Sequence, residues 1–186
     1  MKYYPICLDI SNKLCVVVGG GNVALRKIKN LLKCNAKVSV VAPDVIPQVK
    51  NLSKSGRIKL ILRKFKKSDI NKAFLVISAT SDKLINAEVY KIAKQKGILV
   101  NVVDLPEFCN FILPAVVRRG DLTIAVSTSG SSPAYAVKIK KELELKYGPE
   151  YAVMLEKLKN SRKKILSEVK SQVSRKKILK ELWKKL

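Results

Sequence analysis

Three consecutive glycines beginning at Gly19 constrain the fold more strongly than any other feature of the sequence. The run before them, Leu14–Val18, is typical of a buried strand, and Asn22–Cys34 has apolar residues at helical spacing. Gly19, Gly21 and Ala24 therefore match G-x-G-x-x-A between a strand and a helix. In that motif the small residues permit a tight turn, close approach of a pyrophosphate and close helix packing. We predict a dinucleotide-binding loop; the alternative is a flexible turn without a ligand.

Short β-branched runs alternate with helical patterns beyond this loop, which predicts parallel strands joined by crossover helices. The expected fold is α/β, a Rossmann-type doubly wound parallel sheet. The predicted strands are Leu14–Val18, Lys37–Ala42, Ile58–Leu62, Phe74–Thr80 and Ile98–Val103. The predicted helices between them are Asn22–Cys34, Val45–Ser55 and Asp82–Lys96.

The pattern changes after Asn101, where prolines interrupt it. Leu122–Ser127 predicts one more strand, and a helix is expected from Pro133, capped by Ser132, to about Tyr147. Residues 148–186 are rich in lysine but keep apolar residues at helical spacing. This periodicity predicts a helical C-terminal part and not a disordered tail.

The formal net charge of +24 allows three interpretations: diffuse solvated charge, attraction of an acidic substrate, or nucleic-acid binding. Lysines are spread along the whole chain and are not interleaved with aromatic residues, so the first two are favoured and no nucleic-acid partner is expected. Histidine is absent, which excludes mechanisms that need an imidazole base or ligand. Proton chemistry must then use carboxylates, hydroxyls, lysines or the substrate.

No apolar run approaches the roughly 18 residues of a membrane span, and the N-terminus lacks the pattern of a signal peptide. Neither a membrane partner nor secretion is expected. The four cysteines form no C-x-x-C pair, which favours reduced thiols in the cytoplasm over disulfides or a metal site. They are Cys7, Cys15, Cys34 and Cys109.

Pro43 and Asp44 follow the second predicted strand, where the adenosine ribose of a dinucleotide would lie. The Asp44 carboxylate could accept hydrogen bonds from the ribose diol and would repel a 2′-phosphate, so NAD is favoured over NADP. The alternative is that Asp44 caps a helix starting at Val45.

Two stretches carry a resemblance to a known family: VVVGGGNVALRK at 16–27 and NVVDLPEFCNFILPAVVRRGDLTIAVSTSGSSPA at 101–134. They resemble the precorrin-2 dehydrogenase family, including the N-terminal module of the multifunctional sirohaem synthases. The resemblance implies NAD-dependent oxidation of precorrin-2, a tetrapyrrole with many carboxylates, to sirohydrochlorin. It also implies a homodimer that exchanges C-terminal parts, with a Rossmann domain at 1–113, a dimerisation segment at 114–147 and a helical domain at 148–186.

The resemblance also implies roles for individual residues. Those matching cofactor contacts are Asn22, Val23, Pro43 and Asp44, and they join Gly19 and Gly21, which the glycine motif itself predicts to contact the cofactor. Asp104 resembles an aspartate considered essential for catalysis, and Ser127 matches a serine near the substrate pocket. Close relatives often carry Lys or Thr at Ser131, which puts a basic substrate contact there in doubt.

Asp104 follows the last strand of the predicted sheet, at the edge where doubly wound folds bind ligands. It could take the proton lost when the substrate is oxidised. Alternatively, it holds the following loop by hydrogen bonds.

Ser127, Ser129 and Ser132 offer hydroxyl and N–H groups before a helix, which suits a substrate carboxylate. A well-capped helix explains them equally well. Arg118 and Arg119 could face acidic groups, although a polar hairpin turn is favoured for them.

Two further functions remain open. A regulatory NAD-sensing module would keep the glycine loop and Asp44 but would need neither Asp104 nor the serine loop. Some members of the similar family also insert ferrous or cobaltous ion into sirohydrochlorin, so additional ferrochelatase activity is an open hypothesis.

Overall fold

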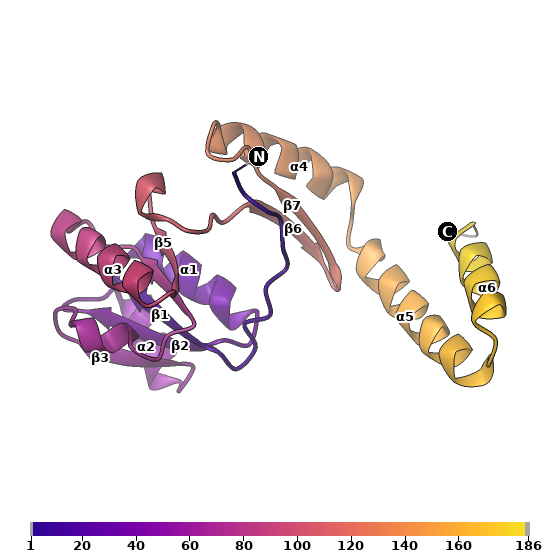
Figure 1. The fold of residues 1–186 in the computed structure, drawn as a ribbon, viewed down its shortest axis with the longest axis horizontal. Helices are drawn as coiled ribbons and strands as arrows, with labels where there is room; N and C mark the ends of the chain where they lie inside the picture. The colour runs from indigo at the N-terminus through magenta and orange to yellow at the C-terminus, as the bar shows by residue number, and fades with distance from the viewer. Residues whose placement is uncertain (1, 185–186) are drawn as a thin grey trace. The chain divides into compact units, whose positions relative to one another are not determined.

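The five strands of the predicted sheet are all present in the computed structural model, which describes residues 2–184. Their bounds are β1 (Leu14–Val18), β2 (Lys37–Ala42), β3 (Ile58–Leu62), β4 (Leu75–Ser78) and β5 (Leu99–Val102). All neighbouring strands are parallel, in the order β3-β2-β1-β4-β5 (Figure 1). The fold-class prediction is confirmed, with β4 and β5 shorter than predicted.

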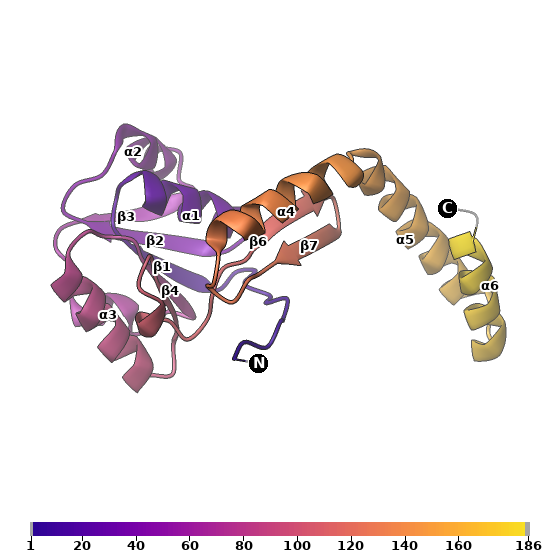
Figure 2. The ribbon, with the colours of Figure 1, turned by 90° about the horizontal axis from the view of Figure 1, so that it is seen from above.

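Helices cover both faces of this sheet because alternate strand residues point to opposite sides. Cys15 and Val17 pack in one core with buried residues of α1 (Asn22–Leu32) and α2 (Pro47–Lys54). Val16 and Val18 pack in the other core, with η1 (Lys67–Ile70) and α3 (Lys83–Gln95). Figure 2 shows α1 and α2 on one side of the sheet and α3 on the other.

The strand order reverses between β1 and β4, which is where doubly wound sheets bind dinucleotides. The register places Val18 beside Val41 on one side and beside Ser78 on the other. The carboxyl ends of the three central strands therefore lie at one level, directly before the glycine triplet.

One alternative for Asp44 is wrong. Helix α2 begins at Pro47 with Ile46 as its N-cap, so Asp44 does not cap it. The fixed φ of proline suits the first helical position, and the helix starts there.

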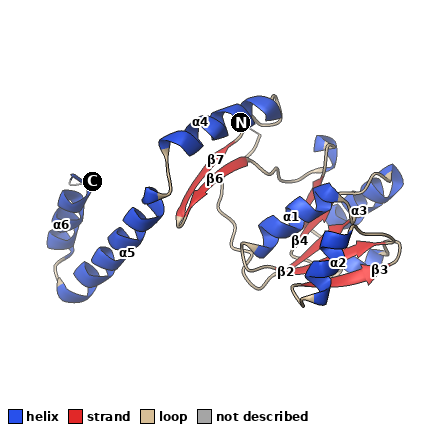
Figure 3. Ribbon diagram, turned by 180° about the vertical axis from the view of Figure 1, so that it is seen from behind, coloured by secondary structure: helices blue, strands red, loops and turns tan. Residues whose placement is uncertain are grey.

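Beyond Ile112 the chain forms a second compact unit. It begins with an antiparallel hairpin of β6 (Ala115–Arg119) and β7 (Leu122–Val126), against which α4 (Pro133–Lys146) packs (Figure 3). The Ser132 hydroxyl caps α4 by accepting a bond from the Tyr135 N–H, as predicted. Strand β6 was not predicted, and Arg118 and Arg119 lie in it, beside the turn rather than in it.

The rest of this unit is helical, as predicted: α5 (Glu150–Glu168) and α6 (Gln172–Lys184). The Arg119 guanidinium donates to the backbone oxygens of Glu144 and Tyr147, at 3.1 and 2.8 Å. It thereby satisfies carbonyls that the end of α4 leaves unpaired. No helix among residues 2–184 is long and apolar enough to cross a membrane.

Candidate functional site

Gly19 makes the turn from β1 into the glycine loop. Its φ of +121° is a conformation that side chains rarely allow, and a Cβ there would lie 2.3 Å from the backbone oxygen of Ala79. Its N–H donates to the Val41 oxygen at 2.9 Å. Gly19 is therefore required by the close passage of the loop over the ends of β2 and β4.

Gly20 links the loop to the segment after β2, which the sequence alone did not suggest. A Cβ at Gly20 would meet the Asp44 oxygen at 2.3 Å and a methyl group of Val45 at 2.4 Å. Its own oxygen accepts a bond from the Ile46 N–H at 3.0 Å. The two segments that would contact the cofactor are thus held together through this residue.

Gly21 is the N-cap of α1, and the space around its missing Cβ is open, with nothing within 4 Å. Within the described chain, no side chain caps α1 and no acidic residue lies in its first turn. Asn22 and Val23 are exposed there. Free N–H groups and the positive end of the helix dipole therefore lie beside open space, an arrangement that suits an anion such as a pyrophosphate.

Pro43 and Asp44 lie exposed at the end of β2. In the part of the chain that the structure describes, no hydrogen bond or ion pair is made by the Asp44 carboxylate. The glycine loop and Asp44 are brought to the same edge of the sheet, so the cofactor residues predicted from the sequence lie together.

A buried polar pair supports the opposite side of the loop. The Ser78 hydroxyl bonds the Asn86 side chain at 2.7 Å, and the Asn86 amide donates to the Thr80 oxygen at 3.1 Å. Asp82 caps α3 by accepting bonds from two backbone N–H groups. These contacts fix the turn after β4, over which Gly19 passes.

Asp104 lies exposed in a turn just beyond β5 and has a left-handed φ of +61°. Asn or Asp is better tolerated than most residues in this conformation. Among the described residues its carboxylate accepts no hydrogen bond, which gives no support to its predicted alternative role as a loop brace.

The loop after Asp104 is held by other residues. The Asn110 side chain accepts from the Val100 N–H at 2.7 Å and donates to the Ile98 oxygen at 2.9 Å, which pairs the open edge of β5. The Cys109 sulfur accepts from the Val102 N–H at 3.2 Å. These bonds hold the chain alongside β5, and none of them uses the Asp104 carboxylate.

Lys27, which was not predicted as a site residue, lies within electrostatic range of Asp104. It is half-buried on α1. Burial lowers the pKa of its ammonium, as does nearby Arg26, whereas the carboxylate of Asp104 opposes the shift. In the sequence, Lys27 is recognisable only as a polar residue beside the apolar face of the predicted helix, which does not reveal that it is half-buried.

The serine loop belongs to the second unit and is built from local hydrogen bonds. Ser127 Oγ accepts from the Ser129 N–H at 3.1 Å, and Thr128 Oγ1 accepts from the Ser132 N–H at 3.1 Å. Ser129 has a φ of +54°. Both predicted roles remain compatible with this geometry, because the hydroxyls that accept these bonds keep a proton to donate.

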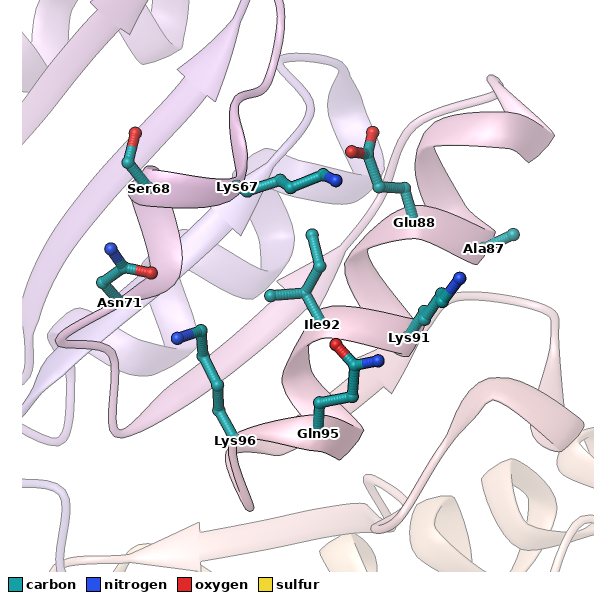
Figure 4. Close-up of a pocket in the computed structure, with 9 residues that line it drawn as sticks. All are labelled: Lys67, Ser68, Asn71, Ala87, Glu88, Lys91, Ile92, Gln95 and Lys96. Atoms are coloured by element: carbon teal, nitrogen blue, oxygen red, sulfur yellow. The ribbon is translucent and has the colours of Figure 1, made fainter.

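A shallow cavity of about 610 Å³ lies away from this edge, between η1 and the later turns of α3 (Figure 4). Three lysines, Lys67, Lys91 and Lys96, and one acid, Glu88, are among the residues that line it. Because η1 precedes β4 and Lys96 ends α3, the cavity lies toward the amino ends of the strands, where doubly wound folds do not bind their cofactor.

No cluster of three potential metal-ligating side chains occurs within residues 2–184. None of the four cysteines in that range forms a disulfide. Burial raises the pKa of the Cys15 thiol to about 11 and also raises that of Cys109, so neither is activated as a nucleophile.

The strand order, the glycine loop at its reversal point and the uncapped helix define a dinucleotide-binding protein of the Rossmann class. A family described as putative NAD(P)-binding matches residues 6–115, and one described as sirohaem biosynthesis protein, central, matches residues 119–145. The solved structure of SirC, a precorrin-2 dehydrogenase, is similar with a TM-score of 0.84 and 30% identity, over 97% of this chain and 89% of that one. The chain belongs to the precorrin-2 dehydrogenase family.

Two curated relatives are named siroheme synthase. The protein from Vesicomyosocius okutanii is 38% identical over the whole chain, and that from Nitrosococcus oceani is 42% identical over 77% of it. The chain spans 39% and 31% of the length of these two relatives.

Proposed function

We propose that this chain oxidises precorrin-2 to sirohydrochlorin, with NAD as electron acceptor. The observation that carries the proposal is the likeness to the precorrin-2 dehydrogenase SirC along 97% of the chain.

The cofactor would be held by the loop between β1 and α1. Gly21 leaves room for the pyrophosphate, and the N–H groups of Asn22 and Val23 at the start of α1 face it. Asp44 would accept hydrogen bonds from the adenosine ribose and repel a 2′-phosphate, which favours NAD over NADP. NAD, when bound, supplies a two-electron acceptor.

Asp104 is the proposed proton acceptor. Oxidation of precorrin-2 removes two electrons and two protons, of which NAD takes up the electrons with one proton. The second proton needs a base, and the exposed Asp104 carboxylate lies at the edge of the sheet where the cofactor would lie.

The serine loop is proposed to bind substrate carboxylates. Ser127, Ser129 and Ser132 precede α4, whose N-terminal dipole favours negative charge. The hydroxyls of Ser127 and Ser132 accept backbone bonds and can still donate to a carboxylate oxygen.

We further propose a homodimer that forms through residues 114–147 and the helices after them. Large apolar side chains remain exposed on this second unit, such as Leu145 at 88% and Val153 at 55%. Apolar groups of this kind gain free energy when a second copy covers them. Cysteines that form no disulfide among the described residues fit the reducing cytoplasm that we propose as its location.

The test is an anaerobic assay with enzymatically made precorrin-2 and NAD, run with and without ferrous ion. Growth of the sirohydrochlorin absorption spectrum together with NADH is expected. A folded chain that binds NAD but never oxidises precorrin-2 would favour the regulatory NAD-sensing module instead.

A further inference from the structure

Asn110 bonds to the outer edge of β5. This strand is the last of the sheet, so no neighbouring strand pairs with the backbone groups on its outer side. The Asn110 side-chain oxygen accepts from the Val100 N–H at 2.7 Å, and its side-chain nitrogen donates to the Ile98 oxygen at 2.9 Å. The Asn110 N–H also donates to the Val100 oxygen, at 3.0 Å. A single residue thus supplies the bonds that a further strand would make.

The loop that leads from β5 to Asn110 is anchored on both faces of the sheet. Val103 packs against the core that includes α1, and Leu105 packs against the core that includes α3. Phe108 packs in the same core as Leu105, and its ring stacks on that of Tyr90 in α3, with centroids 5.1 Å apart. Asp104 lies between Val103 and Leu105, where the chain passes from one face of the sheet to the other.

Asp104 occupies a tight turn at the start of this loop. The Leu105 N–H donates to the Val102 oxygen at 3.3 Å, and Asp104 within the turn has a φ of +61°. The Cys109 sulfur accepts from the Val102 N–H at 3.2 Å, and its thiol lies 3.3 Å from the Leu105 oxygen. The Asp104 carboxylate itself accepts no hydrogen bond within residues 2–184. Its place is therefore set by the backbone of the turn, which the returning chain holds.

We propose that Asn110 is a positioning residue of the dehydrogenase site. Its side chain fastens the loop 103–111 to the edge of β5 and so holds the Asp104 carboxylate where it receives the substrate proton. This inference rests on the proposed function. A thiol is a weak hydrogen-bonding group, so the two amide bonds of Asn110 are the stronger hold on the returning chain. A misplacement of about 1 Å at a reacting group can slow a reaction by roughly 10²-fold.

The structural half of the proposal can be tested without any substrate, by amide hydrogen exchange of Asn110→Ala measured by NMR. Asn110 does not have a left-handed φ, so alanine adds no backbone strain there. The amides of Val100 and Leu105 should exchange about 10-fold faster, because the edge and the Asp104 turn open together. Val17, in the central strand β1, should exchange as in the wild type. If Val100 exchanged faster but Leu105 did not, Asn110 would only cover the edge, and the proposal would be overturned.

The catalytic half is tested by kinetics with precorrin-2 and NAD. Asn110→Ala should lower kcat by about 10-fold for each chain that binds NAD. NAD affinity should change little, because the glycine loop follows β1, which β4 separates from β5. Asn51→Ala is the matched control, since Asn51 is exposed on α2 and its side chain makes no hydrogen bond within residues 2–184. A lowered Tm with a parental kcat would mean a purely structural role and would overturn the proposal.

Asn110→Asp is the second variant, should Asn110→Ala not fold. Its carboxylate still accepts from the Val100 N–H but, when ionised, cannot donate to the Ile98 oxygen. Its kcat should lie between those of the wild type and Asn110→Ala. A parental kcat in a folded Asn110→Asp variant whose Leu105 amide exchanges faster would overturn the proposal.

A double-mutant cycle shows whether Asn110 acts through Asp104. In an Asp104→Asn background, Asn110→Ala should cause no further loss of kcat, because the carboxylate that it positions is already absent. An equal loss in both backgrounds would overturn the proposal. A folded wild-type chain that binds NAD but never oxidises precorrin-2 would overturn the proposed function and this catalytic role together, whereas the exchange measurement decides by itself whether Asn110 holds the turn.

Discussion

The backbone oxygen of Asp44 lies only 2.3 Å from the position that a Cβ atom on Gly20 would occupy. This approach joins the glycine loop after β1 to the segment after β2. The middle glycine of the triplet is therefore required by the protein's own packing, whereas Gly21 borders open space that a ligand would fill. A methyl group added at Gly20 should therefore lower the stability of the fold, whereas one added at Gly21 should weaken the binding of NAD.

Gly20→Ala should destabilise the fold, because the new methyl group meets backbone and Val45 and forces the two segments apart. Overpacking of this kind costs about 1–3 kcal/mol. Gly21→Ala, whose φ of −86° suits alanine, should melt like the parent but bind NAD about 10-fold more weakly, since the methyl group intrudes on the pyrophosphate. Thermal melts and calorimetric NAD titrations check both. Equal melting temperatures of the two variants would contradict this division of roles.

Asp44→Asn tests the choice between NAD and NADP. The amide keeps the size of the side chain but removes the charge that repels a 2′-phosphate. The preference for NAD over NADP should fall by about 10-fold, mainly through tighter NADP binding. Glu88→Gln, an acid on α3 away from the loop, serves as the control in the same fluorescence titrations. A preference unchanged in Asp44→Asn would show that Asp44 does not face the ribose.

The five-stranded sheet could be predicted because its strands are apolar on both faces and its helices have strong apolar periodicity. Strand β6 could not, since Ala115–Arg119 ends in two arginines and is recognisable only through its pairing with β7. The start of α2 was misplaced at Val45 because Pro43-Asp44 has the pattern of a helix start, whereas Pro47 supplies the actual one.

The glycine loop and Asp44 could be placed at one edge from strand order alone, because parallel strands end at the same side of a sheet. The role of Gly20 could not be predicted in this way. It depends on a close approach to a segment distant in sequence, the turn after β2. The spacing of residues along the sequence does not reveal such contacts.

The ion pair of Arg63 and Asp69 should make stability depend on acid pH. Two hydrogen bonds of 2.8 and 2.6 Å join them, and the guanidinium holds the pKa of Asp69 below its ordinary value of 3.8. At pH values near and below the unfolded pKa of Asp69, the native state therefore binds fewer protons than the unfolded chain. The stabilisation should be fully present above the unfolded pKa and be lost as pH falls through the lower, folded pKa.

Asp69→Asn should accordingly lower the Tm by roughly 2–8 °C near neutral pH, and the difference should shrink below about pH 4. Melting curves from about pH 7 to about pH 2 measure it. Asp121→Asn is the control, because Asp121 and its partner Lys159 are both largely exposed and such pairs contribute little. A Tm difference that stayed constant down to the lowest pH would mean that the Asp69 charge is not its source.

Asp104→Asn is the sharpest test of the proton acceptor. Asparagine tolerates the left-handed φ of +61° and keeps the size of the side chain, but its amide cannot act as a base near neutral pH. The rate of precorrin-2 oxidation should fall by roughly 10²-fold, the usual scale for loss of general acid–base catalysis. NAD affinity and Tm should stay near the parental values, because no hydrogen bond of the Asp104 carboxylate holds the described part of the chain together.

Asp104→Gly provides the second variant, since alanine would add backbone strain at this φ whereas glycine adopts it without a steric penalty. The Asp104→Gly variant should be as slow as Asp104→Asn, because both lack the carboxylate. The two replacements differ in size and polarity, so a shared loss would point to the missing carboxylate. Single-turnover measurements with saturating NAD would separate the chemical step from product release. If either folded, NAD-binding variant oxidised precorrin-2 at a near-parental rate, Asp104 would not be the proton acceptor, and positioning of the substrate against the cofactor would have to account for the rate.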